Sequence, residues 1–488
     1  MIRHGLHGNQ IAIATIFGEW HKSFEKLLMY LATLQKYNSG TEVQLNTVPS
    51  VVLEIVIFDQ VFWAFAPAIE GFQYCRPVIC VDVTFLTGKY KGVMLVAVSQ
   101  DAEKEIFPIV FAIVDHETKE SWGWFLNCLR CYVTEHTGLC HISNKHAGLV
   151  TFTKDEPSWR PPYAYHRYCA RHMCANYVSR HGQATGKQVF NAAKEIQQIK
   201  FEKELNKTKR FVVTDGPEKG KEKLYNDIMV VPLDRWSFAQ DGGRQYRTLT
   251  TNVSESINGI LKHARHLPIT TTVMTTFFKS VEYFTDKASK AASKMESGKI
   301  YSDFAMDKYE LWRQKARRHR VTMFDKVMGI YSVQTPVNPT SPYKGNHMHV
   351  VRLNERTCTC NKLQQWKLPC SHVIAICSYH NLDPLQYFSD YWKLQSNINI
   401  YTTLAFQPIH DERYWPEYFG DKIIPDKDRL RGKGRPRVNR IRNEMDEFLE
   451  SQPSQKQSCK MCGNAGHNPR TCPMIWRDAS SSAPTTNV

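Results

Sequence analysis

Residues 76–86 read Arg-Pro-Val-Ile-Cys-Val-Asp-Val-Thr-Phe-Leu, a β-branched run that predicts a strand with one carboxylate in it, Asp82. Asp82 could simply face solvent, but its neighbours are apolar on both sides, and a buried, unpaired carboxylate is costly. The segments that follow predict a turn at 88–92, strands at 93–98 and 106–114, a helix that begins at Glu120, and a short strand at 139–143.

A meander of three strands, a helix and a further strand resembles the start of an RNase H-like fold, in which an Asp on the central first strand is a metal ligand. The expected fold class is therefore α/β, with an RNase H-like core of the DDE transposase and integrase type. We expect this core to carry a helical insertion and to be followed by small zinc-binding modules and a disordered basic tail.

Several motifs resemble, in order, the core of plant Mutator-like element transposases. They lie at 81–92, 107–108, 120–125, 166–172 and 250–258. Together with the zinc finger and the basic segment described below, the resemblance covers roughly residues 20–475. It implies a DDE triad whose carboxylates hold two Mg²⁺ or Mn²⁺ ions, one activating a water or a 3′-hydroxyl and the other stabilising the leaving oxygen.

On this resemblance Asp82 matches the first acid and Glu255 the last. The second acid belongs in a motif like Ser-Asp-Arg-His-x-Gly, which here reads Ser-Asn-Lys-His-Ala-Gly at 143–148, so that Asn144 replaces the expected Asp. An amide oxygen can still contact a cation, but a full negative charge is lost from a site that must hold two dications. We expect the second metal to be lost or much weakened, and catalysis with it.

Other acids near these strands are expected to be structural. Asp155 lies beyond the end of the fourth strand, and Asp101 and Asp115 fall at strand ends, where turn carboxylates are common. Glu255 itself has an alternative interpretation, as the third residue of a helix capped by Asn252. The pair Cys169 and His172 is too incomplete to be assigned to a metal, and its role stays open.

Near the C-terminus, Cys358, Cys360, Cys370 and His372 form a soft-ligand quartet. The first two residues follow the alternating stretch 347–353, and the second two open an apolar, helix-like run. This arrangement resembles a SWIM-type zinc finger. A closed quartet of sulfur and nitrogen ligands is typical of structural Zn²⁺.

A second quartet has the spacing of a CCHC zinc knuckle, a module that binds single-stranded nucleic acid. Its members are Cys459, Cys462, His467 and Cys472. Gly463 and Gly466 allow the tight turns that such a site requires. The sequence therefore predicts two structural zinc sites.

Composition and charge favour an anionic partner. The chain has 488 residues, a formal net charge of +16 and 14 cysteines. No apolar run reaches the roughly 18 residues that span a bilayer, and no hydrophobic leader follows the first residues, so we expect a soluble protein with reduced thiols and no membrane partner. A basic but otherwise ordinary enzyme would explain the charge alone.

The charge is concentrated in residues 429–442, where seven basic residues occur without an acid, and Gly and Pro prevent a stable helix. The Gly434-Arg435-Pro436 core resembles an AT-hook, which lays guanidinium groups in the minor groove of DNA. A nuclear-localisation signal or a solvated linker explains the same residues, and we expect a nuclear protein. The expected nucleic-acid-binding residues are Arg431, Lys433, Arg435, Arg437, Arg440 and Arg442.

The expected organisation has eight segments. Residues 1–70 are a helical remnant of an N-terminal transposase region, 71–174 the first part of the catalytic domain, 175–240 a helical insertion, 241–330 the helices that carry Glu255, 340–385 the SWIM finger, 421–445 the basic linker, 456–475 the knuckle and 476–488 a disordered tail. The resembled family usually carries a longer N-terminal region that helps to recognise transposon ends, so we do not expect specific end recognition here.

Two functions follow. The first is a transposase-derived, zinc-containing DNA-binding protein that binds without cutting, since a binder needs the fingers and the basic segment but not the acids. The alternative is an active DDE transposase that cleaves and joins DNA strands. Asn144 favours the binder. The sequence leaves open the oligomeric state, the DNA site, and whether the SWIM finger contacts DNA or protein.

Overall fold

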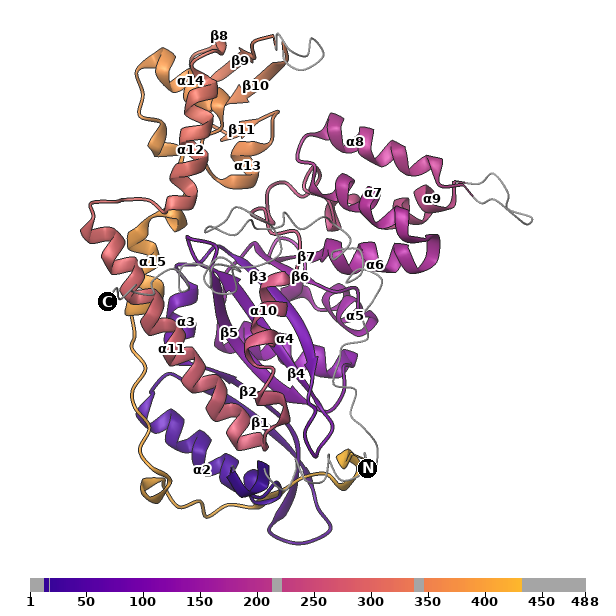
Figure 1. Ribbon diagram of the computed structural model, residues 1–488, viewed down its shortest axis with the longest axis vertical. Helices are drawn as coiled ribbons and strands as arrows, with labels where there is room; N and C mark the ends of the chain where they lie inside the picture. Colours follow the sequence, from indigo (N-terminus) through magenta and orange to yellow (C-terminus); the bar gives the residue numbers. More distant parts are fainter. Residues whose placement is uncertain (1–12, 17, 213–221, 338–345, 432–488) are drawn as a thin grey trace, which may run out of the picture.

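A large mixed sheet forms the centre of the molecule (Figure 1). The computed structural model describes residues 13–16, 18–212, 222–337 and 346–431. The strands of the central sheet are β1 (Glu42–Pro49), β2 (Ile55–Ala64), β3 (Val78–Phe85), β4 (Val93–Gln100), β5 (Ile106–Val114), β6 (Leu139–Ser143), β7 (Ala164–Tyr168) and β12 (Lys422–Ile424).

The strand order in this sheet is β1-β2-β5-β4-β3-β6-β7, and β12 pairs with β2. Strands β3, β4 and β5 form an antiparallel meander, whereas β6 and β7 run parallel to β3. The strands expected at 106–114 and 139–143 coincide with β5 and β6. The strand that carries Asp82 is thus an interior strand, with antiparallel β4 on one side and parallel β6 on the other.

The N-terminal part of the chain differs from the helical region expected over residues 1–70. A helix does form there, α2 (Lys22–Tyr37), but residues 42–64 form β1 and β2, which extend the central sheet. The reason lies in the residues of β2, which are rich in Val, Ile, Phe and Trp and pack on both faces as a buried strand. The expectation of a purely helical remnant was wrong.

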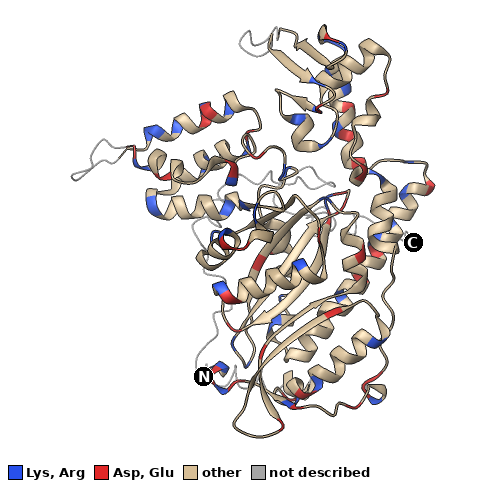
Figure 2. Ribbon diagram, turned by 180° about the vertical axis from the view of Figure 1, so that it is seen from behind, with Lys and Arg blue, Asp and Glu red and all other residues tan. Residues whose placement is uncertain are grey.

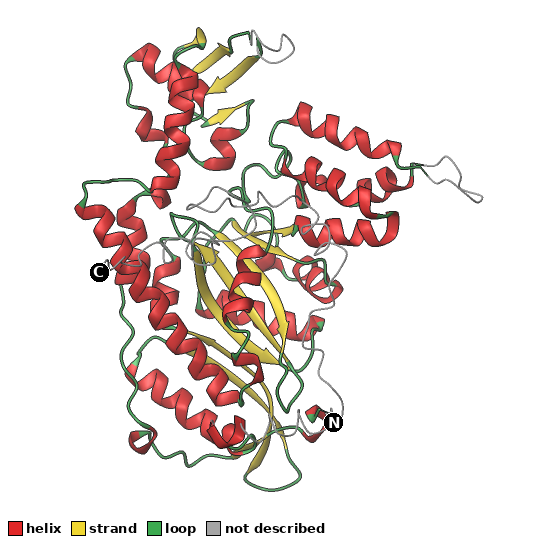
Figure 3. Ribbon diagram, viewed as in Figure 1, coloured by secondary structure: helices red, strands yellow, loops and turns green. Residues whose placement is uncertain are grey.

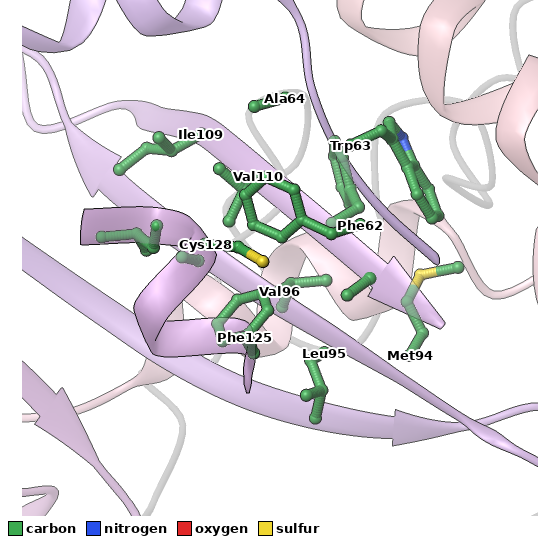
Figure 4. Packing of buried hydrophobic residues seen from close by; sticks show 14 of the residues in the cluster. Phe62, Trp63, Ala64, Met94, Leu95, Val96, Ile109, Val110, Phe125 and Cys128 are labelled. Atoms are coloured by element: carbon green, nitrogen blue, oxygen red, sulfur yellow. The ribbon is translucent and has the colours of Figure 1, made fainter. Parts of the chain in front are cut away.

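The two faces of the sheet are covered by different helices. Phe62 faces α4 (Lys119–Tyr132), where its ring lies 6.0 Å from that of Phe125 (Figure 4). The next residue, Trp63, faces the opposite way and donates a hydrogen bond from Nε1 to Thr276 of α11 (Ile269–Glu296) at 3.0 Å. Because side chains alternate along a strand, α4 and α11 cover opposite faces.

Asp82 lies on the α11 face. Residues that are register partners on neighbouring strands point to the same face of the sheet. The partners in one row across the sheet are Trp63 on β2, Phe111 on β5, Val96 on β4 and Asp82 on β3. The helix α10 (Asn252–Ile260) packs on the same region of β3 and β4. Any function of Asp82 therefore involves the face that α10 and α11 cover.

A helical insertion follows the sheet (Figure 3). After α5 (Ala147–Asp155) and β7, its helices are α6 (Ala170–His181), α7 (Gln183–Lys194), α8 (Gln198–Asn206) and α9 (Lys223–Met229). The insertion expected over residues 175–240 is thus built of several short helices. The insertion has a core of its own, which includes the buried side chains of Tyr177, Phe201 and Trp236.

A second, smaller sheet has the order β11-β10-β9-β8 and lies apart from the first. Its strands are β8 (Arg320–Asp325), β9 (Ile330–Gln334), β10 (Met348–Arg352) and β11 (Thr357–Cys358). The helices that pack with it are α12 (Asp303–Ala316), α13 (Lys362–Trp366) and α14 (Ser371–His380). This module has a separate hydrophobic core around Trp312, Val333 and Ile376.

The chain then returns to the central sheet. Helix α15 (Leu394–Thr402) packs against α3 (Ala66–Phe72) and α11 so closely that a Cβ atom on Gly71 would lie 2.3 Å from the backbone oxygen of Ile400. Residues 403–431 continue as a strap along α2, where Lys26 and Glu412 form an ion pair at 2.6 Å (Figure 1). No helix in the described ranges is both long and apolar enough to cross a membrane.

Candidate metal centres

The expected SWIM quartet is assembled in the second module. Cys358 ends β11, Cys360 follows in a turn, and Cys370 and His372 stand at the start of α14. All four residues are buried, and one ligand atom from each lies within 4.8 Å of the others. Within the part of the chain that the structure describes, no other group of three or more His, Cys, Asp or Glu residues meets this criterion.

The spacing of the ligand atoms fits a tetrahedral zinc ion. Nδ1 of His372 lies 3.5 Å from Sγ of Cys358 and 3.7 Å from Sγ of Cys370. Tetrahedral coordination with the usual Zn–S and Zn–N bond lengths places such atoms about 3.6 Å apart. The four ligands form a closed set, so this geometry is that of a structural site.

The thiols are close enough to share protons. Hydrogen bonding to the sulfurs of Cys360 and Cys370 raises the pKa of Cys358, whereas the pKa of Cys370 is well below its usual value because its neighbours donate to it despite its burial. Negative charge in the cluster is therefore favoured on Cys370. A dication would replace the thiol protons and convert the cluster to thiolates.

Two further imidazoles flank His372. Its ring stacks on that of His319, with centroids 5.0 Å apart, and lies 4.2 Å from that of His349. Burial and the neighbouring His372 lower the pKa of both His319 and His349 to about 4. Both flanking rings are neutral near pH 7, so they pack around the ligand without repelling a bound cation.

The zinc module is fixed to the helical insertion by hydrogen bonds from its short helix α13 and the residue before it. Asn361 donates to the backbone oxygen of Ile196 at 2.9 Å, and Gln365 donates to that of Phe238 at 2.6 Å. Gln365 also donates to the carboxylate of Asp241. Because these donors lie close to Cys358 and Cys360, the folding of the zinc site is coupled to the loop that follows the insertion.

The acidic site lies on the α10 face of the central sheet. Asp82 is 8% exposed, and its Oδ2 accepts a hydrogen bond from Nδ2 of Asn258 on α10 at 3.0 Å. Oδ1 of Asn258 is buried and accepts no hydrogen bond from the described residues. An oxygen atom of this kind beside a carboxylate suits a hard cation such as Mg²⁺.

Glu255 projects from the same helix but is not the capping residue that its position suggested. The N-cap of α10 is Thr251, and Asn252 is already helical. Instead, Arg171 on α6 donates to Oε2 of Glu255 at 3.0 Å and to Oδ1 of Asn252 at 2.7 Å. The carboxylate of Glu255 therefore already has a cationic partner from the protein.

Asn144 directly follows the strand that pairs with the strand of Asp82, since β6 ends at Ser143. Cys80 of β3 pairs with Ile142 of β6, so Asp82 and Asn144 each lie two residues beyond a register pair, with Asn144 in the loop after β6. Oδ1 of Asn144 accepts a hydrogen bond from the backbone N–H of His146 at 3.2 Å. The only side-chain oxygen at this position is thus engaged by its own loop.

Cys169 and His172 lie next to this acidic face. Cys169 is the N-cap of α6, and its Sγ accepts a hydrogen bond from the backbone N–H of Thr251 at 3.3 Å. Burial disfavours both charged forms, but the two groups stabilise each other, so the pKa of Cys169 is lowered and that of His172 raised. Asp82 and Glu255 add to the raised pKa of His172, which places its ring near both acids.

The remaining acids have structural roles. Asp155 forms an ion pair with Lys119 at 2.8 Å, and Oδ1 of Asp101 accepts hydrogen bonds from the N–H groups of Glu103 and Glu105 in the β4–β5 turn. Asp115 pairs with Arg429 of the strap at 3.3 Å. None of these carboxylates takes the place of the missing acid.

Sequence reasoning missed two parts of this region. Arg171, the partner of Glu255, lies in a motif that was noted only as a resemblance, and no spacing rule connects it with a residue 84 positions away. The loop 241–247 was also missed, although its Asp-Gly-Gly-Arg sequence is a turn signal. In this loop the backbone of Gly242, Gly243, Tyr246 and Arg247 is left-handed.

Of the expected nucleic-acid-binding residues, the described ranges contain only Arg431. Its guanidinium donates to the backbone oxygens of Leu86 at 2.7 Å and Gly88 at 3.1 Å. It anchors the strap beyond the end of β3. Lys433, Arg435, Arg437, Arg440 and Arg442, like the knuckle residues Cys459, Cys462, His467 and Cys472, lie outside the described residues.

Comparison with protein families agrees with these two centres. A MULE transposase domain matches residues 78–176, which include Asp82 and Asn144 but end before Glu255. A SWIM zinc finger matches residues 342–381, which include all four ligands of the buried quartet. No curated protein matches the chain. The chain thus contains a MULE transposase domain followed by a SWIM zinc finger, a combination consistent with the Mutator-like transposase family.

Proposed function

We propose that this protein is a transposase-derived, zinc-containing DNA-binding protein whose strand-cleaving activity is impaired. The observation that carries the proposal is Asn144, which directly follows β6, the parallel partner of the strand that carries Asp82, and whose side-chain oxygen accepts a hydrogen bond from the N–H of His146. The strand order around Asp82 supports an RNase H-like core for the MULE domain.

The charge argument favours the loss of one metal ion. A two-metal site holds two dications close together, and anionic oxygens must offset their repulsion. Here one of the three acids is a neutral amide, and Glu255 is paired with Arg171 at 3.0 Å. Asp82, with the buried oxygen of Asn258 beside it, retains the donors for a single ion.

DNA binding rests on the zinc finger and on the charge. The net charge of +16 favours a polyanion, and basic side chains occur on the insertion and on the zinc module, interspersed with acids (Figure 2). The basic run at 431–442 and the CCHC quartet at 459–472 would add duplex and single-strand contacts. A nuclear location follows from a DNA partner.

An active DDE transposase is the alternative. It is favoured by the placement of Asp82 and of the helix that carries Glu255 on one face of the sheet, and by an amide oxygen in Asn144 that could still reach a cation after a rotation of its side chain. In this case Asn144 would be a tolerated replacement rather than a lost ligand.

Metal counting separates the two functions without knowledge of the DNA site. Mn²⁺ is titrated into the zinc-loaded protein and into Asn144→Asp, and bound ions are counted by electron paramagnetic resonance. We expect no more than one Mn²⁺ in the native chain and two, with dipolar coupling between them, in Asn144→Asp. Two coupled ions in the native chain would overturn the proposed impairment and support the active transposase. Asp155→Asn, which changes an exposed acid paired with Lys119, serves as the control.

DNA binding is tested separately, with mixed-sequence duplex and single strands. We expect binding that weakens steeply with salt, persists in Asp82→Asn, and has a salt slope lowered by about one in Arg435→Gln. Native protein that does not bind either probe would refute the binding function itself.

A further inference from the structure

A cavity of about 240 Å³ lies at the free edge of β7, where the end of the helical insertion meets the loop 240–244. Three arginines line it, Arg167, Arg235 and Arg244, together with the carboxylates of Asp234 and Asp241. This volume is many times the space of one water molecule and approaches that of small ligand sites. The lining residues are polar, so the cavity suits a charged rather than an apolar guest.

Arg167 is buried in the wall of this cavity with hydrogen-bonding capacity to spare. Its side chain is 4% exposed, and its Nη1 contacts the backbone oxygen of His166 at 3.1 Å and Asp234 at 3.2 Å. Its buried Nε finds no acceptor among the described residues. A buried cationic donor without an acceptor is costly, which indicates that an acceptor from outside the chain completes the site.

Arg244 is held without being neutralised. Its guanidinium lies 3.6 Å from the centroid of the Tyr165 ring, and it makes no hydrogen bond or ion pair with another side chain in the described ranges. Stacking on an aromatic ring orients the planar group and leaves its N–H edge open. Arg235 is anchored similarly, with one N–H on the backbone oxygen of His166 at 3.1 Å.

The loop that carries Arg244 is built in advance. Oδ1 of Asp241 accepts the N–H of Gly243 at 2.8 Å, and Oδ2 accepts that of Gln245 at 2.9 Å. Gln365 donates a third hydrogen bond to the carboxylate of Asp241. These three hydrogen bonds fix the conformation of the loop. Gly242 and Gly243 adopt the left-handed backbone of this turn freely, whereas the left-handed backbone of Tyr246 is conformational strain of the kind that collects at binding sites.

Two residues that line the cavity lie on the face that carries Asp82. Ile142 of β6 pairs with Cys80 on one side and with Arg167 on the other, so Tyr165 and Arg167 project from the same face as Cys80 and Asp82. Two strand spacings and one two-residue step along a strand separate Arg167 from Asp82, which places their Cα atoms about 12 Å apart. A DNA strand with a rise of about 3.4 Å per nucleotide covers this distance in three to four nucleotides.

We propose that the cavity between Tyr165, Arg167, Arg235 and Arg244 binds a backbone phosphate of a DNA strand that crosses the acidic face. The inference rests on the proposed DNA-binding function and gives it a specific contact. Guanidinium groups recognise phosphate oxygens through paired N–H donors, and here three of them converge from β7, the end of the insertion and the loop. Asp234, which partly neutralises Arg167, sets the strength of the site.

The test uses the full zinc-loaded chain and two substitutions with opposite expected effects. Arg244→Gln removes a phosphate contact, so it should weaken binding of a mixed-sequence DNA strand about tenfold or more and lower the salt slope by about 0.9 for a duplex. Asp234→Asn removes a competing carboxylate and should tighten binding. Arg317→Gln, at an exposed position outside the cavity, controls for the loss of one charge and should leave the salt slope within error of the native value.

The outcomes show whether the cavity binds a phosphate of DNA, a free phosphate, or neither. If native protein binds DNA and Arg244→Gln binds it with the same slope, the DNA function stands and the cavity proposal fails. If inorganic phosphate at constant ionic strength raises the unfolding temperature of the native chain but not of Arg244→Gln, while DNA binding is equal in both, the site takes a free phosphate and its assignment to DNA is wrong. A role of these residues in folding alone would make both substitutions weaken binding, and that result would also overturn the proposal.

Discussion

Arg171 on α6 donates a hydrogen bond to Glu255 on α10 at 3.0 Å, so the carboxylate of Glu255 is paired with a cation from the protein itself. A metal ion must displace this guanidinium or share the carboxylate with it. In the Asn144→Asp background, Arg171→Gln should therefore bind Mn²⁺ about tenfold more tightly, since charged hydrogen bonds of this kind contribute about 1.5 kcal/mol or more. Electron paramagnetic resonance measures the affinity. Arg180→Gln, on the same helix but paired with Asp227, should leave it unchanged.

The zinc quartet predicts that serine substitutions of two buried cysteines, Cys370 and Cys377, have different effects on the zinc content. Cys370→Ser should lower the zinc content by one ion per chain and unfold the second module, because structural zinc supplies folding free energy directly. Cys377, also buried in α14, lies outside the quartet, and Cys377→Ser should keep its zinc. Elemental analysis and limited proteolysis measure both effects. Equal zinc content in native protein and Cys370→Ser would refute the ligand assignment.

Asp101 predicts a pH dependence of stability. Burial raises its pKa to about 6, although hydrogen bonds from the N–H groups of Glu105 and Glu103 and from the hydroxyl of Tyr401 oppose the shift. In the unfolded chain the pKa is about 3.9. Between about pH 4 and pH 6 the folded protein therefore binds more protons, and its free energy of unfolding falls as the pH rises, by about 3 kcal/mol in total.

Asp101→Asn keeps an oxygen that accepts the hydrogen bonds from the N–H groups of Glu103 and Glu105. It should remove the fall in the free energy of unfolding between about pH 4 and pH 6. The comparison of native protein with the variant, by urea unfolding at a series of pH values, cancels the pH dependence of zinc binding that both share. A decline of the same size in Asp101→Asn would assign it to another group. Asp155→Asn, an exposed acid, should behave like the native chain.

Two adjacent glycines of the loop 241–247 predict different costs for the same added methyl group. Both have left-handed backbone, so an alanine at either position costs about 1–2 kcal/mol. At Gly242 nothing lies within 4 Å of the new Cβ, whereas at Gly243 it would lie 2.3 Å from the backbone oxygen of Gln364 in α13. Gly243→Ala should thus be clearly less stable in thermal unfolding and should loosen the zinc module from the insertion. Equal unfolding temperatures for the two variants would show that α13 can yield.

Local patterns predicted β3, β4, β5 and β6, which are half of the eight strands of the central sheet. The strands β5 and β6 were predicted at their observed bounds because each is a short apolar run between turn signals. The zinc ligands were predictable since metal coordination imposes fixed spacings on one short stretch. For Asp82 and Asn144 the family motifs supplied the positions, and the register of β3 and β6 supports their neighbourhood.

Relationships across long sequence separations could not be predicted in this way. Residues 42–64 were expected to be helical, because no local sequence pattern indicates that β2 pairs with β5 about 50 residues later. The fold of the insertion against the sheet brings Arg171 next to Glu255 and Arg167 next to Asp234. Single charged residues have no periodic pattern from which such pairs could be predicted. The capping interpretation of Glu255 did not hold because helix α10 begins one residue earlier, after Thr251.

The return of the chain to the sheet has a consequence for synthesis. Because α15, β12 and Arg431 all follow the zinc finger yet pack on β2, α3 and the end of β3, the core around the central sheet is completed only when the last of them leaves the ribosome. A nonsense codon in or just after the finger would leave the first half of β2 as an open strand edge, which is prone to aggregation. Shortened products should therefore be cleared rather than accumulate as partial binders.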